Sequence, residues 1–536
     1  MKKIIYLFSI IFLSLSSCHG DLDQIPTDPD LFTEIDVYKD VESAKGALAK
    51  IYASLAITGQ KGPDGDPDID SSLIDEGFSQ YTRILYTLNE CSTDEAVVGW
   101  GDPGLPNIHE MSWDVNNPWT QGMYFRLAQL VSFSNSFIEN AAELASNNSE
   151  VAYFIAEARF LRAYAYLQLM DMYANVPLVT KITTELPKQS NRTEIFNFVE
   201  NELIEVATLL PGAQANEYGR VDQVASWALL SRLYLNASVY IGTDKSSKVV
   251  EFAEKVISSS YSLNTTDGNG NGSAYDELFL ADNHMNGAQN EFIFVVQFDG
   301  VNSQSWGGGT FMVHAPIGGT MDPKLFGVNG GWGGLRTTKS LVEKFAYSIT
   351  ASDGDGFPTK WSDSRAMFHT DGQNYEMAKV PVFKEGYAVT KFKNVNINGN
   401  AGSDSSGNHV DTDLSIIRLA EVYLNYAEAV VNGGGGTTST AVGLINQLRV
   451  RAGAPQILSS DLTSDFVLDE RSRELYWEGL RRSDLIRHNK FVTANYLWPF
   501  KAGAANGKAS DDYRKIFPIP EAVLLVNSNL TQNPNY

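Results

Sequence analysis

Apolar residues recur every three or four positions along two long parts of the chain. This period predicts amphipathic helices that bury one face. The first stripe covers residues 37–55, and helix follows helix from about Trp119 onward. Pro177 ends the longest stripe, because its ring removes a backbone hydrogen bond. The other stripes of the first half fall in four segments: residues 154–169, 195–210, 221–240 and 246–257.

Helical periodicity returns toward the C-terminal end. The predicted helices are "SIIRLAEVYLNYAEAVVN", "TAVGLINQLRVRAG" and "DFVLDERSRELYWEGLRRSDLIRHNKF". Charges in the last segment lie three or four positions apart, as in Glu470 with Arg473. Glu478 and Arg482 repeat that spacing, which ordinarily stabilises a helix. We therefore give this charged run a structural role and assign it no site.

Small residues alternate with Tyr and Leu on these stripes, as in antiparallel helix pairs that pack closely. The pattern is typical of tetratricopeptide-type pairs, although no clean repeat of about 34 residues appears. We therefore expect a mainly α fold, in which helix pairs support a loop-rich region with minor β structure.

The segment between the helical parts is rich in Gly, Asn, Asp and Ser, with short apolar runs such as "EFIFVVQF". Long loops with a few small strands are predicted there, and ordered loops of such length are usually functional. We expect one body, residues 35–536, with a helical scaffold at about 36–260 and 414–490. The loop-rich binding region is expected at about 60–118 and 262–413.

The N-terminus has the pattern of a bacterial lipoprotein precursor. Lys2 and Lys3 precede the apolar run "IIYLFSIIFLSL", which is too short to span a bilayer comfortably, and "LSSC" follows. We predict a signal peptide at residues 1–17, lipidation of Cys18 and a tether at residues 18–34. No later segment of the sequence is long and apolar enough to cross a membrane.

Composition narrows the possible partners. The chain has 536 residues and a formal net charge of -23, which argues against nucleic acid because phosphate binding needs a basic surface. The same charge disfavours adhesion to anionic lipid through a basic patch, whereas a neutral ligand is indifferent to it. With Cys18 modified, only Cys91 remains; such a lone thiol is usually a small buried hydrophobe.

No metal or cofactor is expected. The seven histidines show neither an HExxH motif nor an i,i+4 pair, so a zinc site is disfavoured. "DGNGNGSAYDEL" begins like a calcium-binding loop, with Asp267, Asn269 and Asn271 in register. Its twelfth position is Leu278 instead of a bidentate Glu, since Glu277 comes one place early. A turn-rich loop is the better interpretation.

Three tryptophans lie in glycine-rich loops: Trp100 in "VGWGDPG", Trp306 in "SWGGG" and Trp332 in "GGWGG". An exposed indole can hold the flat C–H face of a neutral sugar, while polar side chains bind its hydroxyls. The alternative is that each ring packs under its own loop. The other six tryptophans are interpreted as core or loop packing: Trp113, Trp119, Trp227, Trp361, Trp477 and Trp498.

Several stretches together resemble the SusD/RagB family of Bacteroidota outer-membrane lipoproteins. They are "EARFLRAYAYLQLMDMYANVPLV", "RLAEVYLNYAEAVV", "INQLRVRAG", "ERSRELYWEGLRRSDLIRHNKF" and "FPIPEAVLLVNSNLTQNPNY", in family order. The resemblance implies a SusD-like fold and a binding protein that caps a SusC-like, TonB-dependent transporter and delivers glycans to it. The acidic residues after Cys18 resemble the family's surface-export signal, which implies a body outside the cell.

The likeness is greater toward the founding, starch-binding member, in stretches such as "NECSTDEAVVGW", "DGVNSQSWGGGTF" and "LWPFKAGAANG". It implies an α-glucan ligand, starch or maltooligosaccharide. By that resemblance the ligand contacts are five residues: Trp332, Trp306, Trp100, Asp75 and Arg83.

The sequence departs from that pattern at one place. The founding member has a second Trp where this chain has Val98, and the loop "GWGDPGLP" is one residue shorter. Contacts near Trp100 are therefore expected to differ. Asp75 and Arg83 could also simply pair with each other at the surface.

Two rival functions remain open. The same fold could bind another glycan or a peptide. A glycoside hydrolase would need two carboxylates roughly 5 to 9.5 Å apart across a sugar. Asp75 and Glu76 are adjacent in sequence and so tend to point apart, and no hydrolase pattern is visible. The sequence therefore favours a binding protein without catalysis.

Overall fold

A computed structural model describes residues 34–69 and 77–536. The described part is mainly α-helical, with five small two-stranded sheets, as the sequence predicts. The predicted signal peptide, Cys18 and Asp75 lie outside the described residues. Within the described part, none of the helices combines the length and the apolar character that a membrane crossing needs.

Helices form two groups in sequence. In the described part of the chain, the first group is α2 (Glu34–Val37), α3 (Val41–Ala53), α4 (Tyr81–Asn89), α5 (Pro106–His109), α6 (Pro118–Asn140), α7 (Ala142–Ser146), α8 (Ser149–Tyr173), α9 (Arg192–Val206), α10 (Gln223–Leu235), α11 (Ala237–Ile241) and α12 (Ser246–Ile257). The second group is α13 (Gly308–His314), α14 (Lys339–Glu343), α15 (Leu419–Val431), α16 (Thr438–Arg451), α17 (Ser464–Leu475), α18 (Arg481–Arg487) and α19 (Glu521–Val526).

Strands are short and pair only in twos. Their bounds are β1 (Val97–Val98), β2 (Val176–Pro177), β3 (Gln189–Ser190), β4 (Phe292–Val296), β5 (Leu335–Arg336), β6 (Ile349–Ser352), β7 (Pro358–Trp361), β8 (Phe368–His369), β9 (Ala388–Val389) and β10 (Leu414–Arg418). All five pairs are antiparallel: β1 with β5, β2 with β3, β4 with β10, β6 with β7 and β8 with β9.

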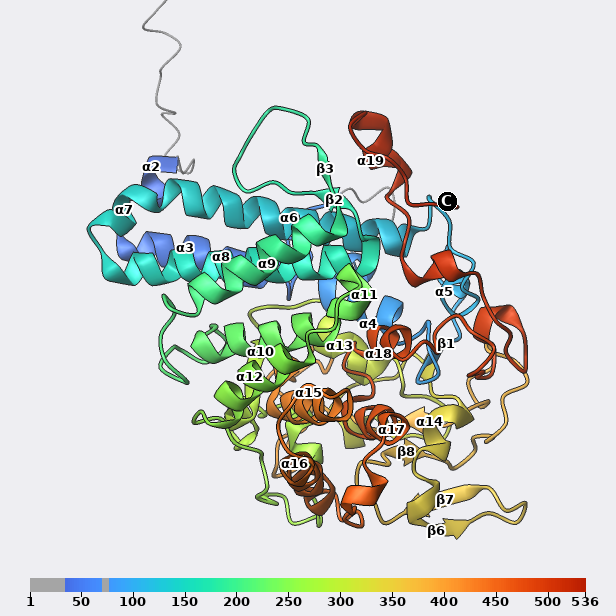
Figure 1. The fold of residues 1–536 in the computed structure, drawn as a ribbon. Coiled ribbons are helices and arrows are strands. Elements are labelled where there is room, and N and C mark those ends of the chain that lie inside the picture. Colours follow the sequence, from blue (N-terminus) through green and yellow to red (C-terminus); the bar gives the residue numbers. More distant parts are fainter. Residues whose placement is uncertain (1–33, 70–76) are drawn as a thin grey trace, which may run out of the picture.

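Consecutive long helices stack side by side through the scaffold (Figure 1). Helix α8 packs between α6 and α9, and the stack continues through α10, α12 and α15. Close packing is possible because α8 buries small residues completely, among them Ala156, Ala158 and Ala163. The predicted helix pairs are confirmed, and β4 confirms the strand expected at "EFIFVVQF".

Local sequence signals set the ends of these helices. The Asn148 side chain accepts hydrogen bonds from the backbone N–H groups of Glu150 and Val151, which caps the start of α8. The helix ends at Tyr173, because Ala174 takes a left-handed φ of 59°. Pro177 lies beyond that end, in β2.

The last predicted helix is wrong in one respect. The run "DFVLDERSRELYWEGLRRSDLIRHNKF" forms two helices, α17 and α18, instead of one. Between them Trp477 has a φ of 66° and Gly479 a φ of 80°, so the chain turns there. The start of "SIIRLAEVYLNYAEAVVN" is also not helical, because it forms β10.

Tertiary charge pairing explains the break between α17 and α18. Glu470 pairs with Arg473 as the helical spacing predicts, with an N–O distance of 2.7 Å. The predicted pair of Glu478 with Arg482 is wrong. Glu478 instead binds Arg418 at 2.7 Å, while Arg482 turns to another partner, Asp171.

Buried ion pairs join α17 to the loop-rich segment. Glu474 accepts from Arg418 at 2.7 Å, from Arg365 at 3.1 Å and from Arg451. Glu291 pairs with both Arg418 and Arg451. Burial alone would raise the pKa of Glu474, but the guanidinium groups of Arg451, Arg418 and Arg365 outweigh it and lower that pKa to about 2.

Tryptophan burial follows the sequence interpretation. Trp113, Trp119, Trp477 and Trp498 are buried, while Trp227 and Trp361 are partly buried against the core. Trp477 belongs to the core as predicted, although it lies in the turn after α17 and not in a helix.

Cys91 is buried as predicted, and burial raises the pKa of its thiol. In the calcium-like loop, the Glu277 carboxylate accepts from the backbone N–H of Asn269, and Asp267 accepts from those of Asn271 and Gly272. These carboxylates bind backbone groups, which confirms a turn-rich loop.

We expect Glu474→Gln to lower the free energy of unfolding by about 3 to 5 kcal/mol at pH 7, because it leaves buried guanidinium groups uncompensated. The folded pKa lies below the ordinary carboxyl value, so the stabilisation is present above about pH 4.3 and is lost toward pH 2. The difference in unfolding free energy between the parent protein and Glu474→Gln should therefore shrink as the pH falls through that interval. Urea unfolding at several pH values measures this difference. Glu521→Gln, at an exposed carboxylate, is the control; equal losses would contradict the prediction.

Candidate functional site

Three indole rings from distant loops lie side by side at the surface. The ring centroids of Trp100 and Trp332 are 6.3 Å apart and inclined at 51°, and those of Trp306 and Trp332 are 6.3 Å apart and inclined at 53°. All three side chains are partly exposed. Together with Arg83 they line an open groove of about 1070 Å³. The other lining residues are Asp64, Gly77, Phe78, Gly99, Gly101, Asp102 and Pro103.

The glycines around Trp332 permit close approach by neighbouring segments. A Cβ on Gly334 would lie 2.2 Å from the Trp100 ring, and a Cβ on Gly331 would lie 2.2 Å from the carbonyl oxygen of Ile317. Real Cβ atoms do not come so close, so glycine is required at both positions. The loop is therefore tightly packed on its inner side, while the indole stays accessible.

A short strand pair brings the first two rings together. Strand β1 pairs with β5, and Gly99 N–H donates to the carbonyl of Gly334 at 3.0 Å. The Trp100 ring N–H donates to the backbone carbonyl of Trp332 at 3.3 Å. Val98 is buried in β1, so its side chain does not line the groove.

Trp306 is held by the N-terminus of α4. The Gln80 side-chain oxygen accepts from the backbone N–H of Arg83, as the cap of α4, and from that of Gly308, at the start of α13. This shared acceptor fixes the segment just after Trp306 against α4. The Trp306 ring N–H donates to the carboxylate of Asp64 at 2.8 Å, which restrains the ring itself.

Arg83 forms part of the floor of the groove. Its side chain is buried, and its guanidinium carbon lies 4.4 Å from the Phe78 ring centroid and 4.7 Å from that of Phe311. One nitrogen donates to the backbone carbonyls of Trp306 and Gly77 at 3.2 Å. Arg83 thus supports the rings from below while still lining the groove.

Four of the five predicted contacts therefore meet in one place, and the fifth, Asp75, is outside the described residues. Sequence reasoning missed Asp64, Phe78, Asp102, His314 and His409, all of which line the groove or contact its rings. Asp64 belongs to "GPDGDPD", which appears only as a break in helical periodicity. The two histidines carry no local signal, because they approach the rings from other segments.

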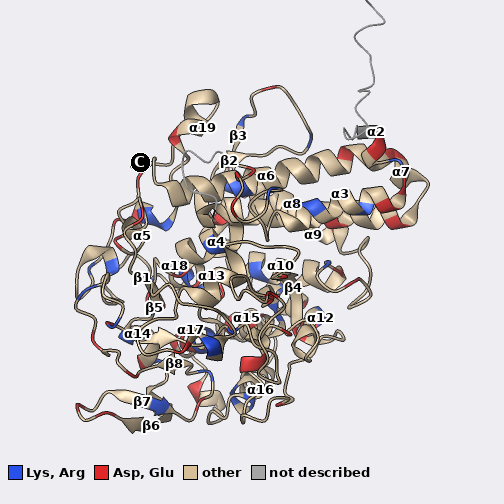
Figure 2. Ribbon diagram, turned by 180° about the vertical axis from the view of Figure 1, so that it is seen from behind, with Lys and Arg blue, Asp and Glu red and all other residues tan. Residues whose placement is uncertain are grey.

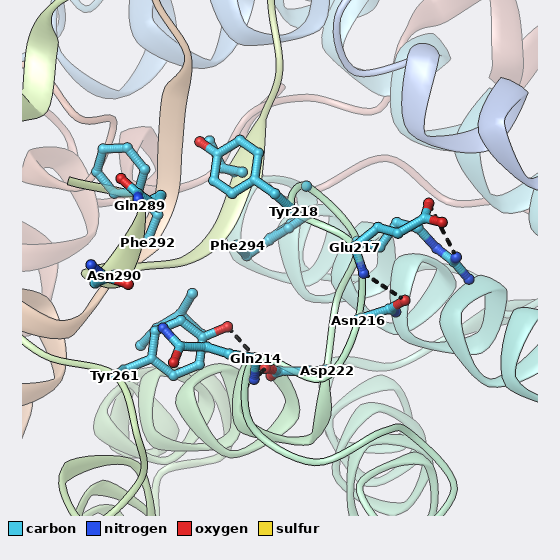
Figure 3. A pocket seen from close by; sticks show the side chains of 14 residues that line it. Gln214, Asn216, Glu217, Tyr218, Asp222, Tyr261, Gln289, Asn290, Phe292 and Phe294 are labelled. Atoms are coloured by element: carbon cyan, nitrogen blue, oxygen red, sulfur yellow. Dashed lines mark hydrogen bonds and ion pairs between the residues drawn. The ribbon is translucent and has the colours of Figure 1, made fainter. Parts of the chain in front are cut away.

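A second, smaller cavity of about 250 Å³ lies between the loop of residues 214–222 and β4 (Figure 3). Its charged side chains already have protein partners. Glu217 pairs with Lys45, and Asp222 accepts from the hydroxyl of Tyr261 at 2.9 Å. We place the candidate site in the tryptophan groove, where the apolar faces are accessible.

Charge and metal-ligating groups add no competing site in the part of the chain that the structure describes. No group of three or more His, Cys, Asp or Glu side chains is arranged to hold a metal ion among residues 34–69 and 77–536. Acidic and basic residues are interspersed along the ribbon in Figure 2. The groove suits a neutral ligand with flat apolar faces.

We expect Gly334→Ala to displace the Trp100 ring and to lower the free energy of unfolding by about 1 to 3 kcal/mol, because the added methyl overlaps that ring. Near-ultraviolet circular dichroism and urea unfolding measure the two effects. Gly330→Ala is the matched control, since no atom lies within 4 Å of its added Cβ. Identical spectra and stabilities for the two variants would contradict the assigned packing.

A helical scaffold that carries an open, aromatic-lined groove defines a class of binding protein, and comparison with known proteins identifies the family. A family model described as "SusD family" matches residues 369–536, and one described as "Starch-binding associating with outer membrane" matches residues 94–235. The chain is 32% identical to the starch-binding protein SusD of Bacteroides thetaiotaomicron, over 99% of this chain and 98% of that protein. This chain belongs to the SusD family of glycan-binding proteins.

Other relatives are more distant. SusD-like protein P2 of Formosa agariphila is 24% identical over the full length of both chains. Solved structures share the fold: a SusD superfamily protein of Parabacteroides distasonis matches with a TM-score of 0.69 and 22% identity, over 92% of this chain and 99% of that one. A laminarin-binding SusD-like protein matches with a TM-score of 0.69 and 21% identity, over 93% of this chain and 100% of that one.

Proposed function

We propose that the protein captures starch and maltooligosaccharides in the tryptophan groove and delivers them to a SusC-like, TonB-dependent transporter. Lipid on Cys18 would anchor it to the outer membrane, with the body facing the cell exterior. The observation that carries this proposal is the convergence of Trp100, Trp306 and Trp332 in one open groove.

The free energy of stacking suits capture followed by release. Covering half of an indole, roughly 80 Å² at about 25 cal/mol/Å², is worth about 2 kcal/mol. Three rings contribute about 6 kcal/mol, from which ordering costs of up to about 2 kcal/mol must be subtracted. The dissociation constant should then lie between the order of millimolar and tens of micromolar. Such weak binding allows the ligand to be passed on.

The inclination of the rings favours a curved ligand. Neighbouring rings are inclined by 51° and 53°, so their faces do not share one plane. An α-glucan chain coils and presents successive sugar faces at changing angles, whereas a flat chain would contact fewer of such inclined rings. The starch-binding name of the relative at 32% identity agrees with this ligand. Laminarin, named for one structural neighbour, is the rival glycan, and a peptide is the other alternative.

Binding without catalysis fits the described groove better than hydrolysis. Hydrolysis needs a carboxyl acid and a second carboxylate placed across one sugar. The described carboxylates of the groove are those of Asp64 and Asp102. Asp64 accepts the ring N–H of Trp306, which assigns it to holding that ring.

We expect protein lacking residues 1–18 to bind maltoheptaose with a dissociation constant between the order of millimolar and tens of micromolar, without degrading it. Calorimetry against maltoheptaose, laminarin oligosaccharides and a neutral peptide gives the ligand class, and a reducing-sugar assay detects hydrolysis. Preference for laminarin would replace the α-glucan assignment. Steady release of reducing sugar would favour the hydrolase.

We expect Trp332→Ala to weaken maltoheptaose binding by about tenfold or more, because one stacked ring carries roughly 1 to 3 kcal/mol by analogy with base stacking. Affinity electrophoresis measures the change. Trp227→Ala, which removes a partly buried ring on α10, is the control for loss of an indole elsewhere. Unchanged affinity in a folded Trp332→Ala protein would remove Trp332 from the site.

A further inference from the structure

One histidine, His314, makes three separate contacts with Trp332 and the loop that carries it. The His314 imidazole stacks on the indole with ring centroids 5.0 Å apart and planes inclined by only 17°. The backbone carbonyl of His314 accepts the Trp332 backbone N–H at 2.9 Å. The His314 Nδ1 lies 2.8 Å from the carbonyl oxygen of Gly330. One residue thus fixes both the ring and the glycine loop that carries it.

Trp306 is also contacted by a histidine, although the two rings are tilted instead of stacked. The centroid of the His409 imidazole lies 4.5 Å from that of the Trp306 ring, with the planes inclined by 47°. The His409 Nδ1 lies 3.3 Å from the carbonyl oxygen of Ser305, the residue before Trp306. Each indole is therefore contacted by an imidazole that also reaches a carbonyl one or two residues upstream.

The loops that carry the rings offer them little packing of their own. Trp332 stands between two pairs of glycines, and Trp306 is followed by three, so the adjacent residues offer few side chains for packing. Both imidazoles are buried, with 2% of His314 and 5% of His409 exposed, whereas both indoles are partly exposed. The imidazoles lie behind the rings and leave ring surface accessible from the groove.

We propose that His314 and His409 are positioning residues of the groove, which hold Trp332 and Trp306 at their mutual angle before any ligand arrives. Preorganised rings lose little freedom on binding, so affinity depends on the histidines although they need not touch the ligand. The role of the ring angle in glycan binding rests on the proposed function; the restraint on the rings does not.

Protonation agrees with this role. An Nδ1 that donates to the Gly330 carbonyl carries the proton of the neutral imidazole. Burial lowers the pKa of His314, which keeps the ring uncharged while it stacks on the indole. A neutral aromatic ring of similar size, such as that of Phe, should reproduce the stacking but not the hydrogen bond.

The first experiment uses no ligand. In protein labelled with 5-fluorotryptophan, the fluorine resonances of Trp332 and Trp306 are assigned with Trp332→Phe and Trp306→Phe. We expect His314→Ala to shift and broaden the Trp332 resonance, and His314→Phe to restore a sharp line. His409→Ala should act in the same way on Trp306, with rescue by His409→Phe. His284→Ala, at an exposed histidine, is the control and should change neither line.

The second experiment measures maltoheptaose affinity of the same variants. We expect a loss of about fivefold or more for His314→Ala and recovery to within about twofold of the parent for His314→Phe. Unchanged Trp332 and Trp306 resonances in both alanine variants would overturn the proposal. Changed resonances with unchanged affinity would overturn the link to binding. A parent protein that does not bind maltoheptaose would refute the proposed function alone, because the resonances are measured without ligand.

Discussion

Buried ion pairs between α17 and three distant segments are the constraint on which this structure depends. Glu474 meets guanidinium groups from the loop-rich segment, from the end of β10 and from the end of α16, all without access to solvent. Charges removed from water are stable only when each has its partner, so the network favours one arrangement of the segments over partial ones. The chain that follows α17 also contacts a segment that leads to the groove. Arg481, at the start of α18, binds Asp94 at 2.7 Å. Asp94 lies just before β1, the strand that leads to Trp100.

The positions of the rings in the groove therefore depend on the scaffold as well as on the loops that carry them. Buried charges fix the start of β1, and β1 pairs with β5, which places Trp100 beside Trp332. Gln80 joins α4 to α13 and so sets the position of Trp306. Glycine allows these segments to approach within distances that a side chain would prevent, as at Gly334. The glycine-rich loop around Trp332 is therefore tightly packed, and the neighbouring segments restrain it.

Sequence periodicity predicts a helix well where it buries a continuous stripe; α12 has the bounds that its pattern indicates, Ser246–Ile257. It fails between α17 and α18, where Glu478 follows the helical charge spacing but binds Arg418 from another segment. The exposed tryptophans could be selected from their glycine surroundings together with the family resemblance. Asp64, His314 and His409 could not, because their contacts with the rings are made across the fold and leave no trace in local spacing.

Rigid rings and weak binding are compatible in the proposed role. Charge contributes little selectivity for a neutral glycan, and the one buried guanidinium of the floor, Arg83, already binds backbone carbonyls and aromatic faces. Selection between glycans must then come from shape, and shape discriminates only if the rings cannot turn to suit each ligand. A groove held from behind by histidines and from below by α4 meets that condition. Affinity can stay low enough for release, since rigidity sharpens the difference between ligands without adding a contact to any of them.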